Sequence, residues 1–242
     1  MEFRYNWNWA ILFTEPYFEW ILSGITWTVL VSCAAWVLAF TLGSIVGIAR
    51  TVDHPVVRAV AGGYVEFFRN IPLLVQMFLW YFVVPELLPA AAGTWVKRDL
   101  PLPQFWTAVV ALGLYTSART AEQVRAGIQS IGRGQIYAAR AIGLAPVQVY
   151  RYVLLPVCYR IVIPPLTSDF MGVFKNSSLA LTIGVMELTA QARQITEYTF
   201  HGFEAFTAAT LLYLTVTFVV VTVMRWVEAK VHIPGTITIE EK

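Results

Sequence analysis

Arg119 is the charged side chain whose position suggests the most specific chemistry. It follows the uncharged stretch Leu100–Ala118, which places its guanidinium at the inner end of a membrane-spanning segment. A guanidinium there can pair bidentately with a carboxylate on a bound molecule. The alternative is an arginine at the membrane surface that pairs with Glu122, three residues later on the same helix. Position alone favours this alternative, because arginines gather at the inner ends of membrane helices.

Two polar strings lie beside other apolar segments. One runs from Arg69 to Gln76 and the other from Lys175 to Ser178. Polar groups are costly against lipid, so we expect the side chains of the second string to face a cavity or a subunit interface. The simpler interpretation of the first string is a helix start with a surface arginine, because proline favours the first turn. For the second, it is a lysine that reaches the outer surface, followed by helix caps.

For Lys175 the two interpretations are equally supported, whereas Asn176 and Ser177 favour a cavity. Asp169, Glu122 and Glu187 could form a proton relay, but they are dispersed over different segments, which favours contacts between helices. The candidate residues of a substrate path are Arg69, Asn70, Gln76, Arg119, Glu122, Asp169, Lys175, Asn176, Ser177 and Ser178.

A short basic segment with small side chains, residues 134–143, separates two apolar stretches. Glycine at its start and Pro146 after it are typical boundary signals of a helix. We expect Ala138, Ala139 and Ile142 on one face, rimmed by arginines, and such a face suits a groove on another protein. The predicted contact residues are Gln135, Tyr137, Ala138, Ala139, Arg140, Ile142, Gly143 and Leu144.

The composition indicates an integral membrane protein. Of the 242 residues, 57% are hydrophobic and 13% are charged, whereas soluble domains carry about 25% charged residues. The predicted fold class is an all-α, polytopic membrane protein with five transmembrane helices, each of about 20 residues or more. The five predicted spans are Trp20–Ala49, Ile71–Ala92, Leu100–Ala118, Tyr150–Phe174 and Ala205–Met224.

The domain prediction has three parts. Residues 1–22 are dense in aromatic side chains and are expected to form an interfacial helix, without a removable signal peptide. Residues 23–232 form the transmembrane domain, and residues 233–242 a cytoplasmic tail. With the N-terminus outside, twelve of the 17 lysines and arginines lie on inner segments and five on outer ones. This asymmetry predicts an N-out, C-in topology, with the basic helix in the cytoplasm.

Several functional classes find no support in the sequence. Cys33 and Cys158 lie in apolar segments and are expected to be small core residues. The three histidines are far apart, so no metal site is predicted. A net charge of +2 gives no indication of a nucleic-acid partner. No nucleophile–base pair is visible, so no catalytic residue is proposed and the chain is not expected to be an enzyme.

The motifs together resemble those of permease subunits of ATP-binding-cassette (ABC) importers for polar amino acids. Residues 134–143, followed by Leu154-Leu155-Pro156, resemble the EAA loop, which seats on the ATPase in that family. Tyr137 departs from the pattern, because the family usually has glutamate there. The strings 69–76 and 175–180 resemble two further elements of these permeases.

Three other stretches look like the glutamate/aspartate type in particular: Gly113–Arg119, Glu122–Arg125 and Tyr150–Pro156. Related permeases often carry an aromatic residue where this chain has Arg119, so the resemblance strengthens the carboxylate-binding interpretation of Arg119. The resemblance extends from Trp20 to Gly235 and implies the fold of a type I ABC importer permease.

The resemblance implies the membrane subunit of an ATP-driven importer of glutamate or aspartate in a bacterial inner membrane. The alternative is a permease for another polar amino acid. An ATP-independent secondary transporter is a less well supported alternative, because no internal repeat is visible. The chain has no G-x-x-x-x-G-K-[ST] loop. No cofactor is therefore expected in it, and ATP would bind a pair of ATPase subunits docked at Gln135–Leu144.

Three further partners follow from the resemblance. A second permease subunit, identical or homologous, would complete the path, because five spans are too few to enclose a gated path alone. A periplasmic or extracellular amino acid-binding protein would deliver the substrate at the outer face. The lipid bilayer would surround the membrane-spanning helices of the paired subunits.

Overall fold

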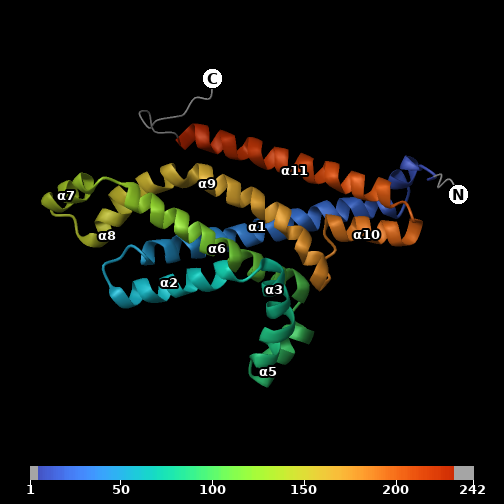
Figure 1. Cartoon of the computed structure of the whole chain (residues 1–242), viewed down its shortest axis with the longest axis horizontal. Helices are drawn as coiled ribbons and strands as arrows, with labels where there is room; N and C mark the ends of the chain where they lie inside the picture. The colour runs from blue at the N-terminus through green and yellow to red at the C-terminus, as the bar shows by residue number, and fades with distance from the viewer. Residues whose placement is uncertain (1–4, 232–242) are drawn as a thin grey trace.

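The computed structural model describes residues 5–231, and these residues form a helical bundle without β-strands (Figure 1). This confirms the predicted all-α fold class. The elements are η1 (Trp9–Phe13), α1 (Tyr17–Ala49), α2 (Pro55–Asn70), α3 (Leu73–Phe78), η2 (Leu79–Val83), α4 (Val84–Leu87), α5 (Ala90–Thr94), η3 (Trp95–Asp99), α6 (Pro103–Ser130), α7 (Arg133–Ala141), α8 (Pro146–Val149), η4 (Tyr150–Leu154), α9 (Leu155–Asn176), η5 (Ser177–Ile183), α10 (Leu188–Thr199) and α11 (Gly202–Val231).

Helices α1 and α6 pack against each other at very short range, and glycines make this possible. A Cβ atom on Gly43 would lie 2.6 Å from the Thr120 Cβ, and one on Gly113 would lie 2.6 Å from Leu38. Both distances are below any normal contact, so only glycine permits this approach of the two backbones. The close packing of α1 and α6 fixes the position, along the bundle, of the charged residues in the second half of α6.

Three π turns are each followed by a proline. Val84, Leu100 and Leu155 each donate their N–H to the carbonyl five residues earlier. The next residue is a proline at 85, 101 or 156. A proline ring clashes with the carbonyl four residues before it and removes one helical hydrogen bond. The wider turn makes room for the proline ring. The helix therefore continues after η2 into α4 and after η4 into α9, whereas after η3 it ends.

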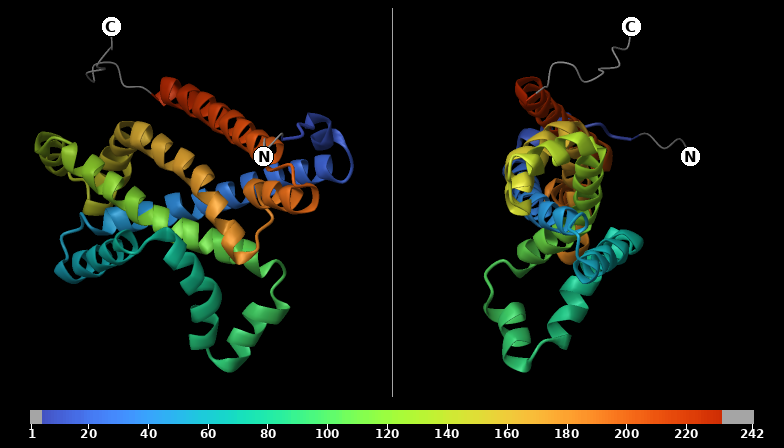
Figure 2. Two further views of the ribbon diagram at one scale, coloured as in Figure 1. Left: turned by 45° about the vertical axis from the view of Figure 1, so that its right-hand side comes forward. Right: turned by 90° about the vertical axis from the view of Figure 1, so that its left-hand side faces the viewer.

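Helices α2 and α3 meet at a sharp elbow. The α2 axis and the segment Leu73–Leu87 are bent by 104° across Ile71-Pro72 (Figure 2). The Gln76 side chain is buried, and its Nε2 donates to the Phe68 carbonyl at 2.8 Å and to the Ile71 carbonyl at 2.9 Å. These carbonyls end α2 and would otherwise lack partners. Gln76 therefore holds the elbow, and the amino group of its side-chain amide is occupied by the chain's own backbone.

We expect Gln76→Leu to lower the free energy of unfolding by about 1–3 kcal/mol, because two buried carbonyls lose their donor. Unfolding of the purified protein in detergent micelles would measure this difference. Gln129→Leu is the matched control, because Gln129 is exposed and accepts only from Arg125. Its effect should stay within about 0.5 kcal/mol. Equal stability of the two variants would show that Gln76 does not hold the elbow.

Three helical stretches in the described residues are long and apolar enough to cross a membrane: Tyr17–Ala49, Pro146–Ile183 and Gly202–Val231. They contain the first, fourth and fifth predicted spans. The bent pair Pro55–Asn70 and Leu73–Leu87 is a fourth candidate. The predicted span Ile71–Ala92 is therefore wrong as a single helix, since the chain turns at Pro72 and breaks again before Pro89.

The third predicted span lies in α6 from Pro103 onward, and α6 has 28 residues but does not meet the same measure of apolarity. Its second half carries Arg119, Glu122 and Arg125, and neighbouring helices cover much of its surface. A helix covered by protein needs less apolar surface than one that faces lipid.

The N-terminal helix is shorter than predicted. Within the described part of this segment, which starts at residue 5, Trp9–Phe13 forms a separate turn and α1 begins at Tyr17, so the boundary drawn at residue 22 falls inside α1. The predicted tail, residues 233–242, lies outside the described residues. The polar segment between η5 and the last span forms the short helix α10.

Candidate functional site

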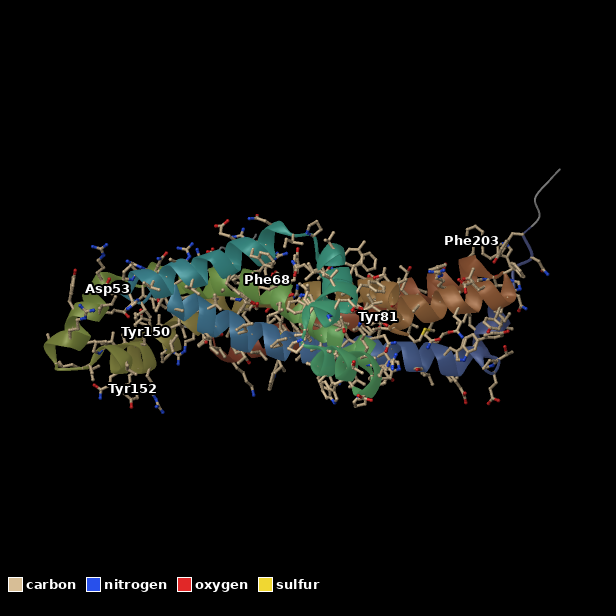
Figure 3. All side chains as sticks on the ribbon, turned by 90° about the horizontal axis from the view of Figure 1, so that it is seen from below. Asp53, Phe68, Tyr81, Tyr150, Tyr152 and Phe203 are labelled. Carbon is tan, nitrogen blue, oxygen red and sulfur yellow. The ribbon has the colours of Figure 1, made fainter. Side chains whose placement is uncertain are left out.

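Helix α7 lies at one end of the bundle and α10 at the other (Figure 1). Tyr150 and Tyr152 share the α7 end, and Phe203 lies at the opposite one (Figure 3). A glycine ends α7: Gly143 has φ +86°, and its N–H donates to the Arg140 carbonyl, while the Leu144 N–H donates to the Ala139 carbonyl at 3.2 Å. This is a Schellman closure, which requires a residue that adopts the left-handed conformation readily.

The surface of α7 differs from the prediction at Ala139. Ala139 is only 5% exposed and packs in a core cluster with Val149 and Leu154. It therefore faces the chain's own core, not the free face, and it is small because the helix lies directly on that core. Tyr137 and Ile142 are exposed, Ile142 at 78%. The exposed residues among those predicted for this contact are Gln135, Tyr137, Ala138, Arg140, Ile142 and Gly143.

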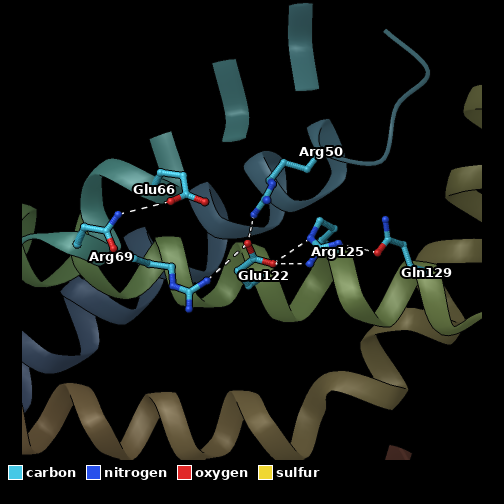
Figure 4. A network of polar contacts seen from close by, with 7 residues as sticks. Arg50, Glu66, Arg69, Glu122, Arg125 and Gln129 are labelled. Carbon is cyan, nitrogen blue, oxygen red and sulfur yellow. Dashed lines mark hydrogen bonds and ion pairs between the residues drawn. The ribbon is translucent and has the colours of Figure 1, made fainter. Parts of the chain in front are cut away.

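Glu122 is the centre of an ion-pair network between three helices (Figure 4). Arg50, at the end of α1, contacts Glu122 Oε1, and Arg125 donates to Oε2 at 2.9 Å. Arg69, at the end of α2, lies 3.7 Å from Oε1. Arg125 also donates to Gln129 at 2.7 Å. The single carboxylate thus holds the ends of α1 and α2 against α6.

Arg119 pairs with Asp169 of α9 rather than with Glu122. Its Nε lies 3.1 Å from Asp169 Oδ1, and Gln123 donates to Asp169 Oδ2 at 2.7 Å. The Asp169 side chain is buried, whereas the Arg119 side chain is 55% exposed. The predicted i,i+3 pair between Arg119 and Glu122 is therefore wrong. The guanidinium remains accessible, because more than half of the Arg119 side chain is exposed.

The two networks carry an excess of positive charge. Four arginines (50, 69, 119 and 125) face two carboxylates, Glu122 and Asp169, so the formal sum is four minus two, or +2. They are linked by α6, on which Arg119 and Glu122 lie one turn apart. A surplus of guanidinium groups attracts carboxylates and disfavours cationic ligands.

The string 175–178 marks the change from α9 to the 3-10 helix η5. Ser177 is buried and donates to the Phe174 carbonyl at 2.7 Å, and Ser178 donates to the Lys175 carbonyl at 2.8 Å. The simpler interpretation, in which these hydroxyls cap a helix N-terminus, is therefore wrong. Lys175 is exposed and Asn176 is partly exposed. Asn70, at the end of α2, donates to Glu66 at 3.5 Å.

The predicted site residues did not include four members of these networks, Arg50, Gln123, Arg125 and Gln129, and the sequence carried a signal for two of them. Arg50 follows thirty uncharged residues directly, which was a signal for a charge at the end of a span. Gln123 lies four residues after Arg119, so both side chains share one face of α6. The glutamine amide completes the contacts of Asp169.

The fold defines a class: a polytopic α-helical membrane protein with charged networks among its helices and a short exposed helix at one end. The chain belongs to the family described as binding-protein-dependent transport system inner membrane components, whose model matches residues 39–233. It is therefore a multi-pass permease component of the inner membrane, as predicted. Membership implies an ATPase and a substrate-binding protein as partners.

Three relatives are similar to this chain over most of their lengths. The glutamate/aspartate import permease protein GltJ of Escherichia coli K12 is 47% identical over 238 residues, 95% of this chain and 97% of the relative. The probable glutamine ABC transporter permease protein GlnM of Bacillus subtilis is 37% identical, covering 87% and 91%. The probable amino-acid ABC transporter permease protein PatM of Vibrio harveyi is 36% identical, covering 82% and 86%.

Solved structures share the fold. A chain from the crystal structure of an amino acid ABC transporter with histidines is 26% identical and superposes with a TM-score of 0.78, covering 93% of this chain and all of that one. A chain of the MetNI methionine ABC transporter in an inward-facing conformation has a TM-score of 0.74 at 19% identity. These likenesses confirm the predicted type I importer permease fold.

Proposed function

We propose that the chain is the permease subunit of an ATP-driven importer of acidic amino acids, glutamate and aspartate. The relative that bears this name is 47% identical over nearly the full length. The charge of the site supports the same substrate class, because the networks around α6 carry a formal surplus of two positive charges. An acidic amino acid has one net negative charge, which such a site attracts.

The observation that carries the proposal is the geometry of Arg119. Asp169 lies 3.1 Å from Nε and orients the side chain, and the guanidinium is exposed enough to reach a second carboxylate. Asp169 fixes the guanidinium without enclosing it, because more than half of the Arg119 side chain is exposed. A cation positioned in this way favours a substrate with a carboxylate in its side chain.

The decisive experiment is ATPase stimulation in the reconstituted complex. The binding protein would be loaded with glutamate, aspartate, glutamine or histidine, and the ATP hydrolysis rate would be measured for each. Stimulation by glutamate and aspartate alone is the expected result. Stimulation by glutamine alone would support the alternative, a permease for another polar amino acid, which the relative named for glutamine suggests.

We further propose that the ATPase docks on the exposed face of α7 through Tyr137, Ala138 and Ile142. The ATP would bind on that partner, so this chain would hold no cofactor and catalyse no reaction itself. Exposed apolar side chains on a short helix suit a groove on a second protein. Tyr137 replaces the usual glutamate, so this contact would be more apolar than is common in the family.

A second permease subunit, identical or homologous, is proposed to complete the substrate path, because Arg69 and Arg119 are both more than half exposed on a single chain. Guanidinium groups at membrane depth need protein or water beside them.

The proposed orientation places the α7 end in the cytoplasm and the α10 end outside. A cysteine at Tyr198, which is exposed on α10, should react with an impermeant maleimide in intact cells. A cysteine at Gln135 should react only after permeabilisation. The background would carry Cys33→Ser and Cys158→Ala, and transport would be checked in each variant. Labelling of Gln135→Cys in intact cells would reverse the orientation and remove the ATPase from α7.

A further inference from the structure

A glutamine side chain joins α6 to α9 beside the buried Asp169 carboxylate. Gln123 Nε2 donates to Asp169 Oδ2 at 2.7 Å and to the Pro165 carbonyl at 3.4 Å. These two contacts use both hydrogens of the amide nitrogen. The Oε1 atom of Gln123 is buried and has no hydrogen-bond partner among residues 5–231. The orientation of the amide group is therefore set by its donor end, and this end holds α9.

The turn of α9 that Gln123 contacts is short of backbone hydrogen bonds of its own. Pro164 and Pro165 lie inside the helix, and neither has an N–H to donate to the preceding turn. The Pro165 carbonyl belongs to this interrupted stretch, and Asp169 lies about one turn after it. Gln123 therefore fixes the backbone of this turn as well as the Asp169 carboxylate.

The two oxygens of the Asp169 carboxylate have different partners. Arg119 Nε lies 3.1 Å from Oδ1, whereas Gln123 donates to Oδ2. A carboxylate without other donors commonly binds a guanidinium through two parallel hydrogen bonds. The Gln123 amide competes with that arrangement, because it occupies the second oxygen and fixes the plane of the carboxylate. The Asp169 side chain is 3% exposed and the Arg119 side chain 55%, so the pair is open to a ligand on the arginine side.

The amide of Gln123 is also uncharged, which affects the charge balance beside Arg119. Arg119 and Asp169 have opposite formal charges, so with a neutral Gln123 the three side chains sum to one minus one, or zero. A carboxylate at position 123 would lower this sum to minus one and would lie against the first carboxylate. An amide gives the buried Asp169 the donor that it needs without adding charge. This balance preserves the attraction of the site for an anionic ligand.

We propose that Gln123 is a positioning residue for the acidic substrate. It holds Asp169 through Oδ2, so Asp169 does not take the whole guanidinium of Arg119, and part of that group is left for the carboxylate of the substrate side chain. This role rests on the proposed function, in which Arg119 binds that carboxylate. Because Gln123 acts through Asp169 and Arg119, its replacement should weaken the binding of glutamate and leave an uncharged amino acid little affected.

The ligand affinity of the purified complex of permease and ATPase, without the binding protein, tests this proposal. The dissociation constants of radiolabelled glutamate and glutamine would be measured by equilibrium dialysis, because these two amino acids are of similar size and differ by one charge. Gln123→Glu should reduce the preference for glutamate over glutamine by about tenfold, since the added carboxylate repels an anionic ligand and competes for Arg119. Gln123→Leu removes the donor without adding charge, and it should weaken glutamate binding by about threefold or more and glutamine binding little.

Gln194→Glu is the matched control, because it makes the same change of charge on α10, at one end of the bundle (Figure 1). It should keep the wild-type affinities for both ligands. Equal losses of glutamate and glutamine affinity in the Gln123 variants would make this residue a purely structural one and would overturn the proposal. Unchanged affinities would overturn it as well. If Gln123→Glu does not assemble, Gln123→Leu decides by the same criterion.

Arg119→Gln in the same assay separates failure of this proposal from failure of the proposed function. If Arg119→Gln leaves the glutamate affinity unchanged, the carboxylate site at Arg119 is itself wrong. If Arg119→Gln lowers the glutamate affinity and neither Gln123 variant does, the site at Arg119 stands and only the positioning role of Gln123 is rejected.

Discussion

Replacing Arg119 with glutamine is expected to reduce the uptake of glutamate and aspartate by about ten- to a hundredfold. A charge-assisted hydrogen bond contributes roughly 1.5–3 kcal/mol, and about 1.4 kcal/mol corresponds to a factor of ten in affinity. The variant also removes the cation beside the buried Asp169 carboxylate, so its stability must be measured alongside uptake. The measurement is initial uptake rate in membrane vesicles, normalised to the amount of assembled complex.

Two further variants separate binding from structure. Arg119→Lys keeps the charge beside Asp169 but cannot bind a carboxylate bidentately, so uptake should remain low while assembly is normal. Arg119→Gln combined with Asp169→Asn removes both charges and restores neutrality, and uptake should still be lost. Full uptake by the lysine variant would reject bidentate recognition. Unchanged uptake by Arg119→Gln would make the residue a surface anchor.

Replacing Ile142 with aspartate is expected to abolish assembly with the ATPase while the permease stays folded. Ile142 is 78% exposed, so the change removes little of the chain's own packing. A central apolar contact in an interface commonly contributes about 2 kcal/mol or more, and an unpaired carboxylate there adds a desolvation cost. The loss in affinity should be about thirtyfold or greater. Co-purification of the ATPase and coupled transport would be measured together.

Tyr198→Asp is the matched control, because it places the same charge on an exposed residue at the α10 end of the bundle. It should assemble normally. Ala139→Asp should behave differently from both, because Ala139 is buried in the core under α7, and a charge there destabilises the permease itself. Normal ATPase binding by Ile142→Asp would move the docking site away from α7.

The spacing of motifs predicted much of this architecture because it reflects local rules. Uncharged stretches long enough to cross a bilayer gave α1 and α11. Pro146 was predicted as the stop signal after α7, and the helix closes three residues earlier, at Gly143, because a Schellman closure favours glycine. Charge pairing depends on which helices become neighbours. The i,i+3 spacing suggested Arg119 with Glu122, yet α9 brings Asp169 to Arg119, while α1 and α2 bring Arg50 and Arg69 to Glu122.

The orientation of small side chains was equally hard to predict. Ala138 and Ala139 are adjacent and chemically identical, and only the packing of α7 on α8 and η4 decides which one is free. The elbow before Leu73 could not be predicted from the sequence, for a related reason. Pro72 signals the start of a helix, but the direction of that helix follows from Gln76, whose contacts reach back to Phe68 across the break.

The π turn before Pro156 has a consequence for the rotational phase of α9. Each residue of an α-helix advances the side-chain direction by about 100°, so the extra residue held in a π turn rotates everything after it by that amount relative to everything before. The wide turn at Tyr150–Leu154 lies between the core contact of α7 and the helix that carries Asp169. The π turn ahead of Pro156 therefore contributes to the direction in which Asp169, thirteen residues later, meets Arg119. Shortening the chain by one residue at this turn would point the carboxylate toward a different neighbour.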